Sequence, residues 1–181
     1  DLVRLAPSLL QKAPRIIAKI SPMADIQHTL QLLPQTTRIH VLSVKNECKE
    51  LLFELERGGE LIEPVITCVN MTANELDLFS FTFADEREAL TPMATQIGTY
   101  LYEPNASLLK AGAFKCVALR MGVSKLHVSS HLYTSDIPVE AFPGRKFAVQ
   151  EVFSFTGKLC KSISKTIPRA NITVRNFPLS V

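Results

Sequence analysis

In the first quarter of the chain, apolar residues have helical and then strand-like spacing in turn. Leucines three and four positions apart indicate an amphipathic helix that Pro14 ends. Ser21 can cap a second helix, and Pro22 can occupy its first position, where a missing N–H costs nothing. The expected elements are a helix over 2–13, a strand over 15–20, a helix over 21–34 and a strand over 38–44. This order predicts a βαβ unit with neighbouring parallel strands.

The middle of the chain predicts one ambiguous element and a hairpin. Residues 46–57 favour a helix capped by Asn46 and closed by two glycines, although an extended conformation over 51–55 remains open. Two strand-like runs follow, and the polar stretch between them is typical of a hairpin loop. The expected elements are strands over 65–69 and 78–83, a loop over 70–77 and an irregular segment over 85–96.

The last part of the chain predicts a further mixture of strands and helices. Asn105 can cap a helix that Gly122 closes. The expected elements are strands over 100–104 and 125–133, a helix over 106–121, a turn over 142–145, a long strand over 146–155, a basic helix over 157–166, a strand over 170–175 and the opening of another helix over 178–181.

Composition narrows the class of protein. The 181 residues are 46% hydrophobic and 20% charged, which is typical of a globular domain. The sequence has neither a signal peptide nor an apolar run of the ~20 residues that a membrane span needs, so we expect no membrane partner. None of the four cysteines forms a CxxC pair, which favours reduced thiols and a cytoplasmic location. Asp1 cannot be an untreated translation start, so we expect a piece of a longer protein.

Basic residues gather at the end of the chain. The seven cations after position 143 are opposed by Glu151 alone, while the preceding residues carry a slight acidic excess. Such a basic end is the footprint expected of a surface that meets RNA phosphates, although a merely solubilising face has about even odds. The candidate RNA-binding residues are Arg145, Lys146, Lys158, Lys161, Lys165, Arg169 and Arg175.

Familiar catalytic motifs are missing from this sequence. The glycines never approach the spacing of a dinucleotide or phosphate loop, and GxSxG and HExxH do not occur. His127 and His131 have the spacing of a metal pair on a helix, but the residues between them favour an extended segment, where the two rings would stand roughly 13 Å apart. We therefore expect neither catalytic residues nor a metal site in this chain.

The most suggestive cluster lies where the first predicted strand ends. Lys19, Ser21, Pro22 and Asp25 follow one another at the carboxyl end of that strand. Open α/β sheets bind ligands at this edge, so these residues are candidates for the edge of a cleft. The alternative is that they only start the next helix, with Asp25 favouring its positive N-terminal end, and the chemistry alone supports this alternative at roughly two to one.

Seven segments together resemble a family of bacterial class I S-adenosylmethionine-dependent methyltransferase-like proteins with a THUMP-like C-terminal domain. They occur in the order KISPMADI (19–26), NECKELL (46–52), YLYEPNA (100–106), LKAGAFK (109–115), HLYTS (131–135), FPGR (142–145) and ANITVRNFPLS (170–180). The resemblance covers essentially the whole chain. No single segment is decisive, but seven in sequence are specific to this family.

The resemblance implies an α/β fold made of three parts. Residues 1–70 resemble the rear part of a doubly wound, Rossmann-like methyltransferase sheet, residues 71–143 a small ferredoxin-like α+β region, and residues 144–181 the start of a THUMP-like domain. By the same resemblance, the loop that binds S-adenosylmethionine and the catalytic motif belong upstream of Asp1. The cofactor of the parent protein would be S-adenosylmethionine, and we expect this piece alone to bind none.

The function implied is that of a scaffold and RNA-docking part of a methyltransferase, with tRNA or rRNA as partner. Two other functions remain open: a non-catalytic RNA-binding or adaptor module, and a structural module that dimerises. Apolar strands such as residues 15–20 are built for burial, so a partial sheet also predicts self-association of the fragment.

Overall fold

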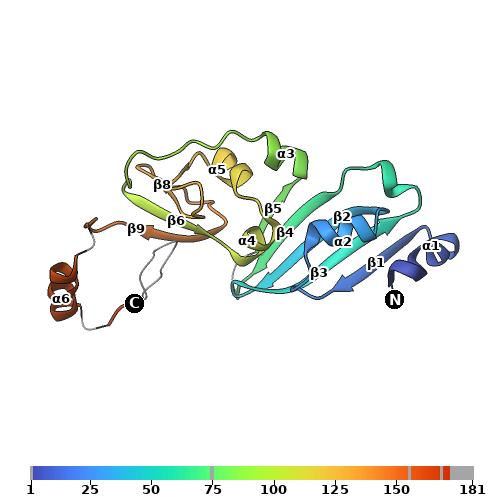
Figure 1. The fold of residues 1–181 in the computed structure, drawn as a ribbon, viewed down its shortest axis with the longest axis horizontal. Helices are drawn as coiled ribbons and strands as arrows, with labels where there is room; N and C mark the ends of the chain where they lie inside the picture. The colour runs from blue at the N-terminus through green and yellow to red at the C-terminus, as the bar shows by residue number, and fades with distance from the viewer. Residues whose placement is uncertain (1, 74–75, 155, 168, 172–181) are drawn as a thin grey trace.

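The computed structural model describes residues 2–73, 76–154, 156–167 and 169–171, and it contains two sheets (Figure 1). The first sheet has five strands and the second has four. In spatial order, the first consists of β1 (Arg15–Ile20), β3 (Glu47–Glu56), β2 (Thr36–Val44), β4 (Val65–Met71) and β5 (Leu76–Phe81). The second consists of β7 (Ser124–Lys125), β8 (Tyr133–Ser135), β6 (Tyr100–Pro104) and β9 (Gly144–Ala148). The chain is therefore a mixed α/β protein, as the sequence predicted.

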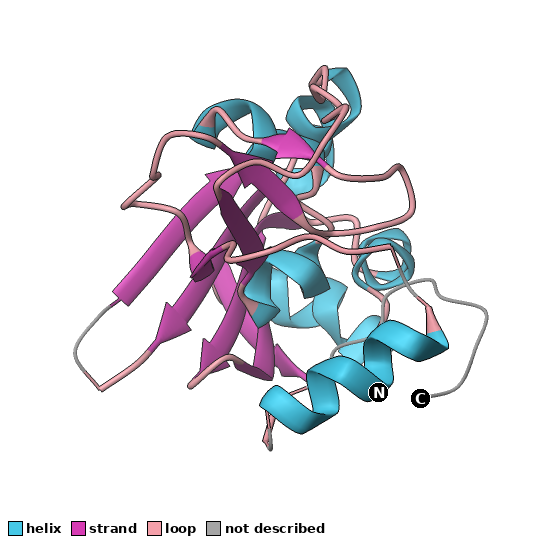
Figure 2. Cartoon of the chain, turned by 90° about the vertical axis from the view of Figure 1, so that its left-hand side faces the viewer, coloured by secondary structure: helices cyan, strands magenta, loops and turns pink. Residues whose placement is uncertain are grey.

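Helices cover one face of the first sheet (Figure 2). The described helices are α1 (Leu2–Lys12), α2 (Ile26–Leu32), the 3-10 turn η1 (Gly59–Leu61), α3 (Phe83–Glu88), α4 (Ala106–Ala111), α5 (Lys115–Met121) and α6 (Gly157–Thr166). Helix α4 comes from the sequence of the second sheet but packs on β2, β3 and β4 of the first. Its Leu108 is fully buried, so the two sheets share one apolar core.

The opposite face of the first sheet is more open. Strand residues alternate between faces, and β1 and β5 show this alternation most clearly. Ile17, Leu76 and Leu78 point to the open face, where about 60% of each is exposed. Buried partners such as Ala18 and Phe79 lie on the helix-covered face. The self-association expected from such a sheet stays a prediction.

The prediction that β1 and β2 are neighbouring parallel strands is wrong. Strands β1 and β2 run in the same direction, but β3 lies between them and pairs antiparallel with both. The predicted helix over 46–57 is β3 instead, and the extended alternative over 51–55 is correct. The cause is the turn before it: Lys45 and Asn46 have positive φ values of 51° and 62°, the two-residue geometry that joins antiparallel strands into a hairpin.

Several other predicted elements need correction in their bounds. The helix over 106–121 is two helices, because Gly112 adopts a left-handed φ of 80° and ends α4. The segment after 85 is not irregular throughout, since Thr82 and Asp85 form a capping box that starts α3. The strand over 125–133 is a loop between β7 and β8, and β9 ends at Ala148 rather than continuing to residue 155. Residues 170–171 form no strand, and 172–181 lie outside the described residues.

The remaining elements confirm the predictions made from the hydrophobic pattern. Helices α1 and α6 and strands β1, β2, β4 and β6 lie where the sequence placed them, within a few residues. Strands β4 and β5 form the predicted hairpin, which belongs to the first sheet. That sheet therefore runs past residue 70 to Phe81, whereas the division into domains at 70 and 143 stays a prediction.

Gly144 allows β9 to approach β6 closely, and replacing it should destabilise the second sheet. A Cβ atom at this position would stand 2.2 Å from the Glu103 carbonyl oxygen and 2.9 Å from the Asn105 nitrogen. Because both are backbone atoms, Gly144→Ala should lower the free energy of unfolding by about 2 kcal/mol or more, measured by urea denaturation. Gly157→Ala is the control, since nothing lies within 4 Å of its added Cβ. Equal stability of the two variants would contradict this close approach.

Candidate functional site

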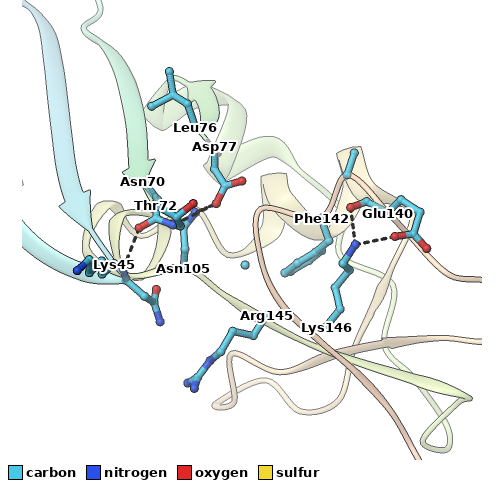
Figure 3. A pocket seen from close by; sticks show the side chains of 13 residues that line it. Lys45, Asn70, Thr72, Leu76, Asp77, Asn105, Glu140, Phe142, Arg145 and Lys146 are labelled. Atoms are coloured by element: carbon cyan, nitrogen blue, oxygen red, sulfur yellow. Dashed lines mark hydrogen bonds and ion pairs between the residues drawn. The ribbon is translucent and has the colours of Figure 1, made fainter. Parts of the chain in front are cut away.

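A groove lies where the two sheets meet (Figure 3). Strands β2 and β4 are parallel neighbours, and Val44 pairs with Met71, so both strands end at the same edge of the sheet. The turn after β2 and the loop after β4 form one side of the groove, and the segment 140–146 before and within β9 forms the other. Its volume is about 560 Å³. The groove therefore occupies the carboxyl edge of parallel strands, where α/β sheets bind ligands.

Asn70 anchors the first half of the groove floor. It is 4% exposed, and its side chain uses both ends of the amide. The Oδ1 atom accepts hydrogen bonds from the Ser43 hydroxyl at 3.0 Å and from the Asn46 backbone N–H at 3.1 Å. The Nδ2 atom donates to Asp77 Oδ2 at 3.1 Å. Asn70 thus ties the β2–β3 turn to β5.

Asn105 connects the same carboxylate to the second sheet. Its Nδ2 donates to Asp77 Oδ2 at 3.3 Å, and its Oδ1 caps α4 by accepting from Leu108 N at 3.2 Å. Asn46 Oδ1 in turn accepts from the Ala106 N–H at 2.7 Å. These side chains, which we call the junction network, are Ser43, Asn46, Asn70, Asp77 and Asn105. They fix the start of α4 against the edge of the first sheet.

Three cations surround the groove. Lys45 lies on one wall, and Arg145 and Lys146 lie on the other (Figure 3). Arg145 forms an ion pair with Glu103 on the neighbouring strand, while its own side chain is 58% exposed. Lys146 Nζ donates to the carboxylate and to the carbonyl of Glu140, both at 2.7 Å. The groove wall on β9 is therefore basic, but each of its cations has an acidic neighbour.

The predicted cleft-edge residues lie at the same edge of the sheet but do not line the groove. Lys19 forms an ion pair with Glu50 at 2.8 Å, and Ser21 Oγ accepts from Met23 N at 3.2 Å. Helix α2 begins at Ile26, not at Ser21, because Asp25 is its N-cap and accepts from His28 N at 2.7 Å. Pro22 lies in the turn between β1 and α2. A role for these residues at a cleft stays a prediction.

The predicted RNA-binding residues fall into two groups. Arg145 and Lys146 belong to the groove. Lys158, Lys161 and Lys165 are exposed on α6, which Figure 1 shows set apart from both sheets. Arg169 is exposed after that helix, and Arg175 lies outside the described residues. The predicted strand over 146–155 ends at Ala148, so it does not extend to the residues that precede α6.

Nucleophilic chemistry has little support in the described residues. Burial raises the pKa of Cys68 to about 12, and burial together with Glu86 raises that of Cys116 to about 12. Burial also raises the pKa of the Cys48 thiol. These thiols therefore stay protonated at neutral pH, and a protonated thiol is a poor nucleophile.

The two histidines with metal-pair spacing lie in a loop, not on a helix. His127 and His131 lie in the loop between β7 and β8, and the His131 ring stacks on Phe114 with centroids 3.7 Å apart. Within the described ranges, no three His, Cys, Asp or Glu side chains group as metal ligands. The part of the chain that the structure describes also contains no helix of the length and apolarity needed to cross a membrane.

Of the residues that line the groove, the sequence predicts Arg145 and Lys146 as binding residues but not the others. The sequence predicts Asn46 and Asn105 as N-caps, and Asn105 is the N-cap of α4. Asn46 starts no helix of its own but lies in the β2–β3 turn, where its Oδ1 accepts from the first N–H of α4. The signal that was available is the Lys45-Asn46 pair between two runs of alternating apolar residues, which is typical of a tight hairpin turn. Asn70 and Asp77 carry no comparable signal, because only the pairing of β4 with β2 and β5 brings them together.

Comparison with known proteins identifies two similarities. A family of ferredoxin-like domains matches residues 100–143, which contain β6, α4, α5, β7 and β8. The crystal structure of a "putative methyltransferase" from Porphyromonas gingivalis W83 is 42% identical over 99% of this chain, with a TM-score of 0.89. This chain spans 46% of the length of that protein. No curated protein matches the chain.

The junction network predicts that Asn70 stabilises the fold as well as shaping the groove. Asn70→Ala removes the hydrogen-bond partner of the Ser43 hydroxyl, the Asn46 N–H and the Asp77 carboxylate. It should lower the free energy of unfolding by about 2–3 kcal/mol. Thr67→Ala on the same strand removes an exposed contact with Ser80 and should cost within about 0.5 kcal/mol. Urea denaturation of both variants measures the difference. A cost for Asn70→Ala no larger than that for Thr67→Ala would contradict the network's role.

Proposed function

We propose that this chain is the rear, RNA-docking part of an S-adenosylmethionine-dependent methyltransferase. The observation that carries the proposal is the identity of 42% over nearly the whole chain with the P. gingivalis protein described as a "putative methyltransferase". A TM-score of 0.89 supports the same architecture in both. The proposal also takes RNA as the substrate and S-adenosylmethionine as the cofactor of the whole protein.

The arrangement of the first sheet supports the methyltransferase part. Strands β1, β2 and β4 run in one direction, and α2 connects the first two. This is compatible with the closing strands of a Rossmann-like sheet, in which β3 is a reversed insertion. The glycines of the sequence never approach the spacing of a glycine-rich cofactor loop. We therefore assign the cofactor loop and the catalytic motif to the other part of the protein.

The distribution of charge supports RNA as the substrate. The exposed lysines of α6 are spaced three and four residues apart, which puts them on one side of the helix. Leu159 and Ile163 are half-buried on another side. A row of exposed lysines binds phosphates without reading bases, which suits docking of an RNA whose modified nucleotide lies elsewhere. We propose residues 144–181 as the start of a THUMP-like domain on the same grounds.

The first prediction from this proposal concerns the cofactor. Isothermal titration of the 181-residue chain with S-adenosylmethionine should show no specific binding, because the donor's binding loop belongs to the rest of the protein. The full-length protein is the control and should bind the donor. A dissociation constant in the micromolar range for the 181-residue chain would mean that the cofactor site lies within it.

The second prediction concerns RNA docking by α6. In the full-length protein, replacing Lys158, Lys161 and Lys165 with glutamate should weaken RNA binding about 30-fold or more at ~50 mM salt, and should reduce the salt dependence. Replacing the same lysines with arginine keeps the charge and is the control. S-adenosylmethionine binding should stay unchanged in both variants. RNA affinity that survives the glutamate substitutions at low salt would make α6 a solubilising surface.

A further inference from the structure

We propose that the groove between the two sheets binds one nucleotide of single-stranded RNA, whose flanking phosphates contact Lys45 on one wall and Arg145 and Lys146 on the other. The inference rests on the proposed function, because it takes RNA as the substrate. It assigns a second RNA contact, away from α6, with a different task. The lysines of α6 would hold the strand, and the groove would recognise a nucleotide.

The dimensions of the groove suit an unpaired nucleotide. Its volume of about 560 Å³ lies within the range of about 300–1,000 Å³ that is typical of small-ligand sites. The groove floor consists of side-chain amides and the carboxylate of Asp77. In an RNA duplex the major groove is too deep and narrow for side chains to read, and the shallow minor groove is recognised mostly by its shape, so a recess of this kind suits the splayed-out base of an unpaired strand.

The cations of the groove are held in place by the backbone around them. Lys45 lies in a tight turn, and its N–H donates to the Met71 carbonyl at 2.8 Å. Arg145 and Lys146 lie on β9, where they pair in register with Glu103 and Tyr102. An arginine has five N–H donors and a lysine has three, so each ion pair leaves donors that can bind phosphate. The two walls together present cations on both sides of the space.

The floor of the groove is rigid and can read a base. Asn70 and Asn105 are 4% and 3% exposed, and both donate to the same oxygen of Asp77. A carboxylate accepts about four hydrogen bonds, so Asp77 can also accept one from a base amino group or a ribose 2′-hydroxyl. Because Asn70 and Asn105 already hold the Asp77 carboxylate in place, its side chain loses little conformational entropy when RNA binds.

The groove is also connected to the first RNA contact along the chain. Strand β9 carries Arg145 and Lys146, and the chain leads from its end at Ala148 to α6 at Gly157. Both surfaces therefore belong to one basic stretch of sequence. Glu151 is the single acidic residue in this stretch.

A charge reversal at Lys45 tests the groove. Lys45→Glu in the full-length protein should weaken binding of a labelled single-stranded RNA of ~12 nucleotides about 10-fold at ~50 mM salt, measured by fluorescence anisotropy. Lys12→Glu makes the same change of charge at the end of α1, remote from the groove, and should leave the affinity within about twofold. Glu140→Gln removes the carboxylate beside Lys146 and should raise the affinity about twofold.

The comparison of ligands decides whether the groove holds RNA or any small anion. Lys45→Glu should affect single-stranded RNA more than duplex RNA of the same length, and inorganic phosphate at ~10 mM should not displace the single strand. Equal losses for Lys45→Glu and Lys12→Glu, with RNA binding by the unaltered protein intact, would overturn the groove alone. Displacement by phosphate would make the groove an anion site and would also overturn the inference. Absence of RNA binding by the unaltered protein would overturn the proposed function with it.

Discussion

The carboxylate of Asp77 is a polar link between the two sheets at the floor of the groove. It accepts from Asn70, which holds the turn after β2, and from Asn105, which starts α4. Both amides are buried, and a buried amide without a partner costs about 1–3 kcal/mol. The least costly arrangement is therefore the one that satisfies all of these groups together. The relative position of the sheets, and with it the shape of the groove, depends on this set of bonds.

Acidic residues partly neutralise the positive charge of the groove wall on β9. Glu103 and Glu140 each neutralise one cation of β9, so the groove is basic without a large excess of positive charge. Ion pairs near the surface contribute little to stability, and their main effect here is to orient the two cations. Such an arrangement favours selective recognition over tight binding, whereas the lysines of α6 provide attraction that salt screens easily.

The hydrophobic pattern was sufficient for most elements but not for their pairing. Alternation and capping residues located β1, β2, β4, β6 and α6, because these signals are local. The segment that forms β3 shows the limit of these signals. Lys49, Glu50, Phe53 and Glu54 have helical spacing, but the Lys45-Asn46 turn and the pairing with a strand on each side make the segment a strand. The groove could not be predicted, since Asn70 and Asp77 meet through strand register that no local pattern encodes.

The insertion of β3 between β1 and β2 also has a consequence for biosynthesis. Ile20 pairs with Leu51, so β1 leaves the ribosome well before its partner exists. At roughly 5–20 residues per second, the nascent chain carries an unpaired apolar strand for a few seconds. The β2–β3 hairpin can close within microseconds once it emerges, because its turn is only two residues long. Co-translational folding of this sheet should thus begin with the β2–β3 hairpin, and β1 can pair with β3 before β4 and β5 are made.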